Sequence, residues 1–242
     1  MSLEPEQDWK LIPAWFGLPV ELDEIDGVGP DKPWFTWATA FVVATVSILT
    51  LIQGALAPEH YIINEWGLIP KDAWRHHGLT FITSFFLHGS VWHLVSNLYF
   101  LIVFGGSVER YAGSLRWLLI IGVATLIGGG LDVAIETGSA LPLIGASGGI
   151  SGLLVYYGLE FPRAQLGVTV LFEWKEFSAW RLLVGWVLLQ IAGSLLQVNG
   201  GSHVASLAHL GGGIAGAVFW LIWKVCPFDS AGDAFDSSDY EN

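Results

Sequence analysis

The chain has 242 residues, of which 53% are hydrophobic and only 13% are Asp, Glu, Lys or Arg. A soluble domain carries about 25% charged residues, so this composition excludes an ordinary water-soluble domain and favours a membrane protein. The formal net charge of −12 comes mainly from acids at the two ends of the chain, and the middle is nearly neutral. Without a basic face, nucleic acid is not an expected partner. The single cysteine, Cys226, excludes a disulfide framework and a cysteine-based metal site.

The two acidic ends divide the chain into three parts. Residues 1–33 are predicted to form an acidic cytoplasmic N-terminal segment, and residues 227–242 an acidic, flexible C-terminal tail. Both ends are poor in hydrophobic pattern and rich in turn residues, so we expect them to be flexible. The membrane-embedded domain is predicted to span residues 34–226.

Six apolar stretches follow one another within this domain. They cover residues 34–57, 85–104, 115–135, 144–161, 182–197 and 204–225. About 20 apolar residues are enough to cross the hydrocarbon core of a bilayer. The first stretch starts too late, and after an acidic leader, to be a signal peptide. We therefore predict an all-α membrane protein, a bundle of six transmembrane helices with both termini on one side.

Two connections between these stretches are long enough for structure of their own. Residues 58–79 carry Trp66 and Trp74 among mixed charges, as expected for a segment in the outer membrane interface. Residues 165–180 are expected to form a similar surface element on the inner side.

The orientation follows from Lys and Arg near the helix ends. The side of the termini holds seven of them, and the other side only two, Lys71 and Arg75. The seven are Lys32, Arg110, Arg116, Arg163, Lys175, Arg181 and Lys224. Because cytoplasmic loops carry the excess of positive charge, we predict a multi-pass protein of the cell membrane with both termini in the cytoplasm.

Four polar side chains stand out inside the apolar stretches: His93, Asn97, Ser147 and His209. Each has an ordinary explanation by itself, since a transmembrane Ser bonds its own helix and a His or Asn joins helices together. Their depth is the informative feature. Ser147 lies three residues after the start of its stretch and His209 five, about 5 and 8 Å deep. His93 falls at the same level if its helix begins near His88.

Small residues surround two of these polar groups. Gly145/Gly149 and Gly148/Gly152 have the spacing that allows close helix contact, and His209 shares a stripe with small residues of its own helix. Such faces can bring a hydroxyl and an imidazole to the 2.6–3.2 Å that base-assisted attack needs. Tight packing alone would produce the same glycine pattern. The stripe with His209 consists of Ala205, Gly212, Gly213 and Gly216.

The four polar residues match the parts of a serine hydrolase. Ser147 opens a helix, where unpaired backbone N–H groups favour a negative charge. His93 and Asn97 are four apart and share a helix face, so both can direct N–H groups at an oxyanion. His209 supplies the base. Asp132 is only a weak candidate for orienting it, so the sequence predicts a Ser–His dyad.

These residues resemble the motifs of the rhomboid intramembrane serine proteases. The likeness spans residues 40–225 and implies the six-helix fold of that family. The matching elements, in the family's order, are His88-x4-His93-x3-Asn97, Gly105-Gly106-x2-Glu109-Arg110-x2-Gly113, Gly145-Ala146-Ser147-Gly148 and Ala208-His209-Leu210-Gly211-Gly212.

The resemblance implies a role for each matched residue. Ser147 is the implied nucleophile, and His209 the implied general base and acid. His93 and Asn97 are the implied oxyanion side chains, helped by the Ser147 N–H. The fifth helix and fifth loop are the implied mobile entrance. The residues with implied structural roles are His88, Glu109, Arg110, Gly145, Gly148 and Gly212.

One family feature is displaced. Rhomboids often carry Trp-Arg eight residues before the position of His88, where this chain has Leu79 and Thr80. Trp74-Arg75 lies five residues further upstream, so the first loop either contains an insertion or folds differently.

The function expected from the sequence is intramembrane serine endopeptidase activity on transmembrane segments near the outer membrane face. Its partners are then the lipid bilayer and transmembrane protein substrates, with no cofactor and no metal. A catalytically inactive, rhomboid-like binding protein is the alternative. A redox or haem protein with His93 and His209 as axial ligands is a further class, in which Ser147 has no role.

Overall fold

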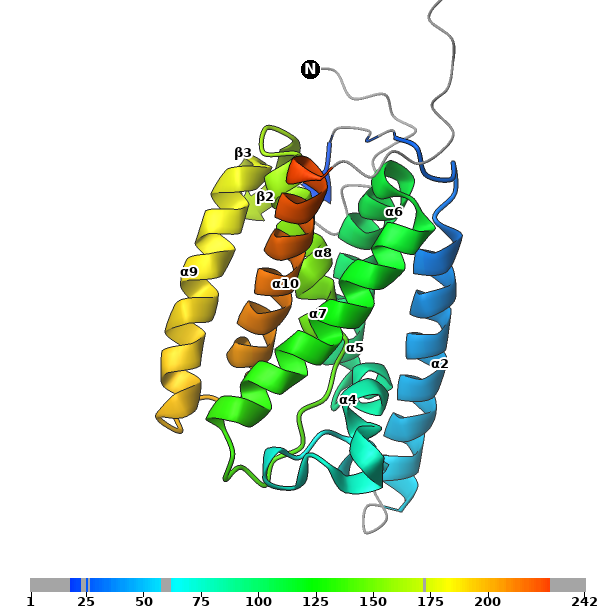
Figure 1. Ribbon diagram of the computed structural model, residues 1–242, viewed down its shortest axis with the longest axis vertical. Helices are drawn as coiled ribbons and strands as arrows, with labels where there is room; N and C mark the ends of the chain where they lie inside the picture. Colours follow the sequence, from blue (N-terminus) through cyan, green and yellow to red (C-terminus); the bar gives the residue numbers. More distant parts are fainter. Residues whose placement is uncertain (1–17, 23–24, 26, 58–61, 172, 227–242) are drawn as a thin grey trace, which may run out of the picture.

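The structure is a computed structural model, which describes residues 18–22, 25, 27–57, 62–171 and 173–226. Long helices stand side by side as a bundle, and the described chain begins and ends at the same end of it (Figure 1). The helices are α2 (Trp34–Leu56), α3 (Ile62–Trp66), η3 (Pro70–Asp72), η4 (Arg75–Gly78), α4 (Thr80–Thr83), η5 (Ser84–Phe86), α5 (Val91–Phe100), the π-helix η6 (Leu101–Gly105), α6 (Gly106–Ala112), α7 (Ser114–Ile135), α8 (Ser147–Glu160), α9 (Ala179–Val198) and α10 (Ser206–Val225). The strands are β1 (Val20–Glu21), β2 (Gln165–Val170) and β3 (Glu173–Ser178).

The prediction of a helical membrane bundle is confirmed. Five helices of the described chain are long and apolar enough to span a membrane: α2, the continuous Val91–Ala112, α7, α9 and α10. The stretch predicted as the fourth span forms α8, which has only 14 residues. At 1.5 Å per residue α8 is about 21 Å long, shorter than a bilayer core of about 30 Å. Most of its residues are buried, so α8 lies inside the bundle.

Glycines allow α8 and α10 to pack with their backbones in contact. A Cβ on Gly212 would overlap the carbonyl oxygen of Gly148, and a Cβ on Gly216 would overlap that of Gly152. The predicted pairing of small faces is therefore present for Gly148 and Gly152. Gly149 instead faces α7, where a Cβ would lie 2.9 Å from the Ile121 carbonyl oxygen. Different glycines of one helix thus serve two different interfaces.

A small sheet closes the end of the bundle where the described chain begins and ends. Its strands are antiparallel in the order β1-β2-β3, and β3 leads directly into α9. The predicted surface element at 165–180 is therefore a β-hairpin. We call this end of the bundle the sheet end, and the opposite end, which carries residues 62–86, the loop end.

The described part of the N-terminal segment is held by the bundle. The Glu21 carboxylate accepts hydrogen bonds from the hydroxyls of Ser107 (2.6 Å) and Tyr157 (2.8 Å), and the Pro19 carbonyl accepts one from Tyr99 (2.7 Å). Gly29 N–H donates to the Arg110 carbonyl at 2.8 Å. The expectation of a wholly flexible N-terminal segment is wrong for residues 18–22 and 27–33. The predicted flexible tail at 227–242 lies outside the described residues.

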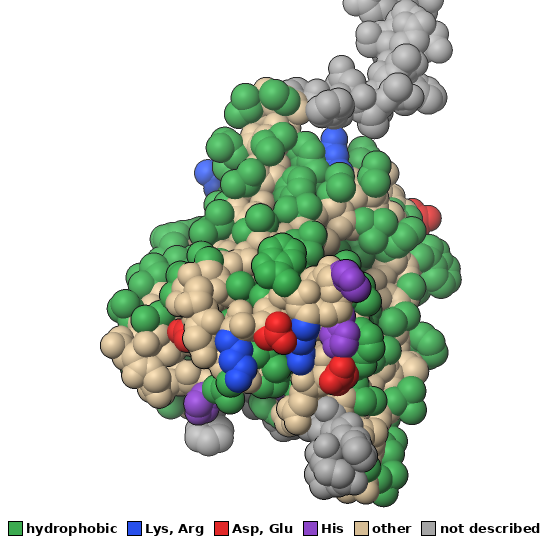
Figure 2. Space-filling view, turned by 60° about the horizontal axis from the view of Figure 1, so that its bottom comes forward, with side chains coloured by type: hydrophobic (Ala, Val, Ile, Leu, Met, Phe, Trp, Pro, Cys, Tyr) green, Lys and Arg blue, Asp and Glu red, His purple; other side chains and the backbone are tan. Residues whose placement is uncertain are grey.

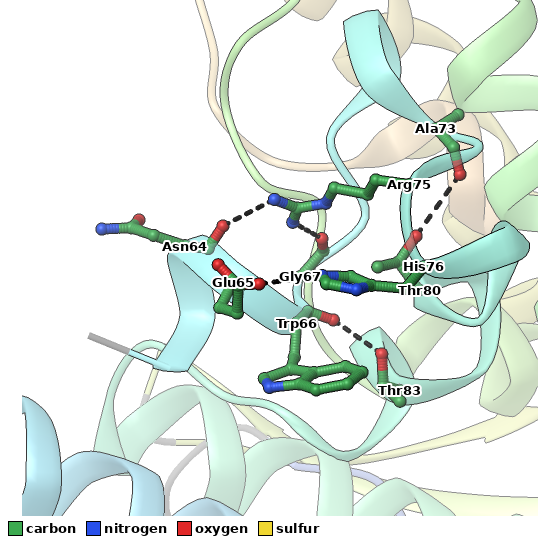
Figure 3. Close-up of polar contacts among 9 residues, drawn as sticks. All are labelled: Asn64, Glu65, Trp66, Gly67, Ala73, Arg75, His76, Thr80 and Thr83. Atoms are coloured by element: carbon green, nitrogen blue, oxygen red, sulfur yellow. Dashed lines mark hydrogen bonds and ion pairs between the residues drawn. The ribbon is translucent and has the colours of Figure 1, made fainter. Parts of the chain in front are cut away.

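The loop end is ordered around Arg75 (Figure 3). Its guanidinium donates to the carbonyl of Asn64 at 2.8 Å and also to that of Gly67. His76 pairs with Glu65 at 2.9 Å and stacks on Trp66 at 4.6 Å between ring centroids. The two residues of the displaced Trp-Arg pair therefore differ in role. Arg75 holds the loop together through its hydrogen bonds, whereas Trp74 is 79% exposed.

Two backbone bonds tie this loop to the segment before α8. Leu68 and Leu143 exchange N–H···O bonds of 3.0 and 2.7 Å.

Charged and histidine side chains gather on the face of the loop end, within a mostly hydrophobic surface (Figure 2). This mixture suits the membrane interface predicted for the loop.

We predict that Gly216→Ala destabilises the protein by about 1–3 kcal/mol, because its methyl group meets the Gly152 backbone and overpacks the α8–α10 contact. Thermal unfolding in detergent measures the change. Gly130→Ala in α7 is the matched control, since a Cβ there meets nothing within 4 Å. Equal losses in the two variants would contradict the close-contact explanation.

Candidate active site

Ser147 and His209 meet near the loop end, because both lie at the start of their helices. Ser147 is the first residue of α8, and His209 lies in the first turn of α10. The Ser147 hydroxyl oxygen lies 2.8 Å from His209 Nε2. The chain thus brings together a hydroxyl and an imidazole that are 62 residues apart.

The α8–α10 contact sets this distance. A Cβ on Gly148, the residue after Ser147, would touch the carbonyl oxygen of Ala208 at 3.5 Å. Ala208 directly precedes His209, so the two helices meet next to the functional pair. A side chain at Gly212, whose Cβ would overlap the Gly148 carbonyl oxygen, would separate the helices and lengthen the Ser147–His209 distance.

Gly145 shapes the turn that leads into Ser147. Its φ of +114° suits glycine, and its N–H donates to the Ser84 carbonyl at 2.9 Å. A Cβ at this position would lie 2.8 Å from His93 Nε2 and 3.7 Å from the Ser147 hydroxyl oxygen. The His93 ring and the Ser147 hydroxyl therefore face the same small space beside Gly145. Gly145 is not part of α8, so the predicted helical pair Gly145/Gly149 does not form.

Asn97 lies one turn beyond His93 on α5 and is buried. Its side-chain amide donates one hydrogen bond to the His93 carbonyl at 2.9 Å. An amide nitrogen carries two hydrogens, so this bond fixes the side chain and leaves the second N–H as a donor.

A cavity of about 530 Å³ joins these groups. It is lined by His93 and Asn97 of α5, by Ser147 of α8, and by His209 of α10. The α9 side contributes Trp186 and Gln190, and the loop before α10 contributes His203. The lining is mostly apolar with a few convergent polar groups, which is typical of a binding site for a small or extended ligand.

His88 lies between Ser47 of α2 and the His93 ring of the site. Its side chain is fully buried, and Nδ1 lies 2.8 Å from the hydroxyl of Ser47 on α2. Because that hydroxyl donates to the Phe86 carbonyl at 2.9 Å, it accepts from His88 Nδ1–H. The His88 ring packs edge-on against His93 at 4.8 Å. His88 thereby connects α2 with the His93 ring.

Glu109 and Arg110 lie far from this cavity, at the sheet end. The buried Glu109 carboxylate accepts from the N–H groups of Phe35 (3.1 Å) and Thr36 (2.8 Å), and from the Ser114 hydroxyl (2.8 Å). It therefore caps the first turn of α2, whose N–H groups have no partner within the helix. Arg110 donates to the Ser107 hydroxyl at 3.1 Å.

Gln190 is the residue of the site that the sequence analysis missed. Its side-chain oxygen lies 2.9 Å from His209 Nδ1. The signal was available, since Gln190 and Gln197 are the two side-chain amides of a mostly apolar helix and lie seven residues apart on one face. Asp132 does not contact His209; its carboxylate accepts from Gln197 at 2.8 Å. In the described chain, no group of three or more His, Cys, Asp or Glu side chains is placed to hold a metal ion.

Comparison with known proteins gives consistent matches. Presenilin-associated rhomboid-like protein A, mitochondrial, of Danio rerio is 34% identical over 194 residues, which cover 76% of this chain and 48% of the relative. RHOMBOID-like protein 12, mitochondrial, of Arabidopsis thaliana is 28% identical, covering 67% of this chain and 51% of the relative. Rhomboid protease GlpG of Klebsiella pneumoniae is 29% identical, covering 72% and 59%.

The chain spans about half the length of the curated relatives it matches. The family model described as the Rhomboid domain matches residues 71–226, which contain all four predicted motifs and the whole cavity. The chain therefore belongs to the rhomboid family.

Proposed function

We propose that the protein is an intramembrane serine endopeptidase that cleaves transmembrane segments of membrane proteins near the outer membrane face. The observation that carries this proposal is the 2.8 Å contact between the Ser147 hydroxyl and His209 Nε2 in a cavity that also presents His93 and Asn97. Nucleophile, base and oxyanion donors are then within reach of one bound peptide carbonyl.

The proposed reaction has two halves. The Ser147 oxygen attacks the carbonyl carbon while His209 Nε2 takes the hydroxyl proton, and N–H groups of His93, Asn97 and Ser147 stabilise the oxyanion. His209 passes the proton to the leaving amine, which leaves an acyl-enzyme. Water then attacks the ester with His209 again as base, releasing the acid and restoring the Ser147 hydroxyl. Because the base must be neutral, activity is lost towards acid pH.

The position of the cavity supports the proposed cleavage near the outer membrane face. It lies near the loop end, where charged side chains gather, so water reaches it from that face. A peptide bond inside a helix is hydrogen-bonded and shielded, so the substrate segment has to unwind before attack. Helix α9, which buries few of its residues within the protein, forms one wall of the cavity and is the proposed entrance, in line with the family resemblance.

The alternative function is that of a catalytically inactive rhomboid-like binding protein. The names of several relatives say rhomboid-like and not protease, which is the observation that favours it. The haem alternative is disfavoured by the site, since both ring nitrogens of His209 already hold hydrogen bonds to Ser147 and Gln190.

We expect Ser147→Ala and His209→Ala each to lower cleavage of a transmembrane substrate in liposomes by roughly 1,000-fold or more, since either change removes half of the dyad. Labelling of Ser147 by a fluorophosphonate should disappear in the first variant. Ser194→Ala in α9, outside the cavity lining, is the control serine. Undiminished turnover in either dyad variant contradicts the proposal, and binding of an intact substrate without cleavage by the unmodified protein favours the alternative.

We also propose that the sheet end faces the cytoplasm of a cell membrane, so that both termini are cytoplasmic. Helix ends and connections at the sheet end hold the excess of Lys and Arg, which normally remains on the cytoplasmic side. The names of some relatives place those proteins in mitochondria or chloroplasts, so the orientation requires its own test.

The single cysteine provides that test. Cys226 is exposed at the sheet end, just after α10. We expect a membrane-impermeant maleimide to label it only after intact cells are permeabilised. Cys226→Ser combined with Asn199→Cys moves the thiol to an exposed position at the opposite end of α9, and should be labelled without permeabilisation. The reverse pattern would show the opposite orientation.

A further inference from the structure

We propose that Gln190 is a positioning residue, whose side-chain oxygen holds the His209 ring in the tautomer and orientation that the reaction needs. The inference rests on the proposed function and adds a third member to the dyad. It is carried by two contacts on opposite sides of one ring: His209 Nδ1 lies 2.9 Å from the Gln190 oxygen, and Nε2 lies 2.8 Å from the Ser147 hydroxyl.

The tautomer follows from these two contacts. To take a proton from Ser147, Nε2 must be unprotonated, so the hydrogen of the neutral ring has to be on Nδ1. An N–H group at Nδ1 needs an acceptor, and the Gln190 oxygen is placed to be one. In an apolar bundle an unpaired N–H group is costly, so the Gln190 contact favours the reactive tautomer over the inactive one.

Among the described residues, Gln190 and not a carboxylate is the partner of His209 Nδ1. Among the described residues that line the cavity, the titratable groups facing His209 are His93 from α5 and His203 from the loop before α10. Asp132 on α7 is directed to Gln197. Gln190 therefore takes the place of the acid in a conventional triad. As a neutral acceptor it orients the His209 ring but brings no negative charge to it.

The helix that carries Gln190 buries few of its residues within the protein. Along α9, which is described throughout, only Ala179 and Ser194 are buried. Gln197, two turns beyond Gln190, donates to Asp132 at 2.8 Å and accepts from Leu207 N–H of α10 at 3.1 Å. Gln190 and Gln197 thus both fasten α9, but only Gln190 touches His209. This difference separates a role in orienting the base from a role in holding the helix.

The test compares Gln190→Met, Gln190→Glu and Gln197→Met in the full-length protein in liposomes. Gln190→Met keeps the length of the side chain and removes the acceptor. We expect its kcat/KM to fall roughly 10- to 100-fold, because a hydrogen bond to a ring that becomes charged is lost. The fall should appear in kcat, since the contact matters most when the ring carries the proton.

Gln190→Glu should restore activity towards that of the unmodified protein. A carboxylate next to Nδ1 stabilises the protonated ring, so the acid limb of the pH–rate profile should move to higher pH. Gln197→Met, which loosens α9 without touching His209, should leave the position of that limb unchanged. Equal pH profiles and equal losses for Gln190→Met and Gln197→Met would overturn the inference, as would a Gln190→Glu variant no more active than Gln190→Met at any pH.

A second readout does not depend on proteolysis. The ¹⁵N chemical shifts of histidine-labelled protein in bicelles, assigned with a His209→Gln variant, report which ring nitrogen carries the hydrogen. We expect Nδ1–H at His209 in the unmodified protein and in Gln197→Met, and a mixture of tautomers in Gln190→Met. An unchanged tautomer in Gln190→Met refutes the positioning role even if the protein proves to be a protease. The expected shifts in a protein that cleaves nothing would refute only the proposed function.

Discussion

The backbone contact between α8 and α10 is the constraint on which the site depends. Gly148 faces Gly212 and Gly152 faces Gly216, at separations that leave no room for a Cβ on Gly212 or Gly216. Lipid chains are as apolar as the helix surfaces, so burial of apolar area does not drive this association, and close van der Waals packing has to. The close contact that holds the two helices together also places the Ser147 hydroxyl of α8 against the His209 imidazole of α10.

Polar side chains make the other connections of the bundle. Glu109 closes the first turn of α2, His88 reaches Ser47 of that helix, and Gln197 joins α9 to Asp132 of α7. Each joins elements distant in sequence, and each would be costly if left unpaired in an apolar surrounding. A few such groups therefore fix the relative positions of helices whose apolar faces alone would allow several arrangements. The bundle is mostly apolar, but the contacts that fix how its helices are placed against one another are polar.

Much of this arrangement could be predicted from the sequence. The apolar stretches locate the helices, and the shared depth of His93, Ser147 and His209 places them in one layer. The start of α8 could not be predicted, because the positive φ of Gly145 keeps residues 144–146 out of the helix, and the sequence does not reveal that conformation. Gln190 was missed although it shares a helix face with Gln197, because its contact with His209 depends on the rotation of α9 about its axis, which the sequence pattern does not fix. The pairing of Val20–Glu21 with β2 could not be predicted either, because it depends on tertiary contacts that the acidic composition of the N-terminal segment does not indicate.

The two halves of α9 are held in different ways. Its first residue continues directly from β3, which is hydrogen-bonded through β2 to the N-terminal strand β1. The far half is held by the Gln190 and Gln197 amides and by the close approach of Gly193 to Ser206 of α10. Ala179 lies about 28 Å from Val198 along the helix, so any tilt of α9 about its sheet-bound first residue would displace the Val198 end the most. The three strands thus hold the first residue of α9 in place. Glu21 of the acidic N-terminal segment contributes to this support, because it lies in β1 and accepts hydrogen bonds from Ser107 and Tyr157.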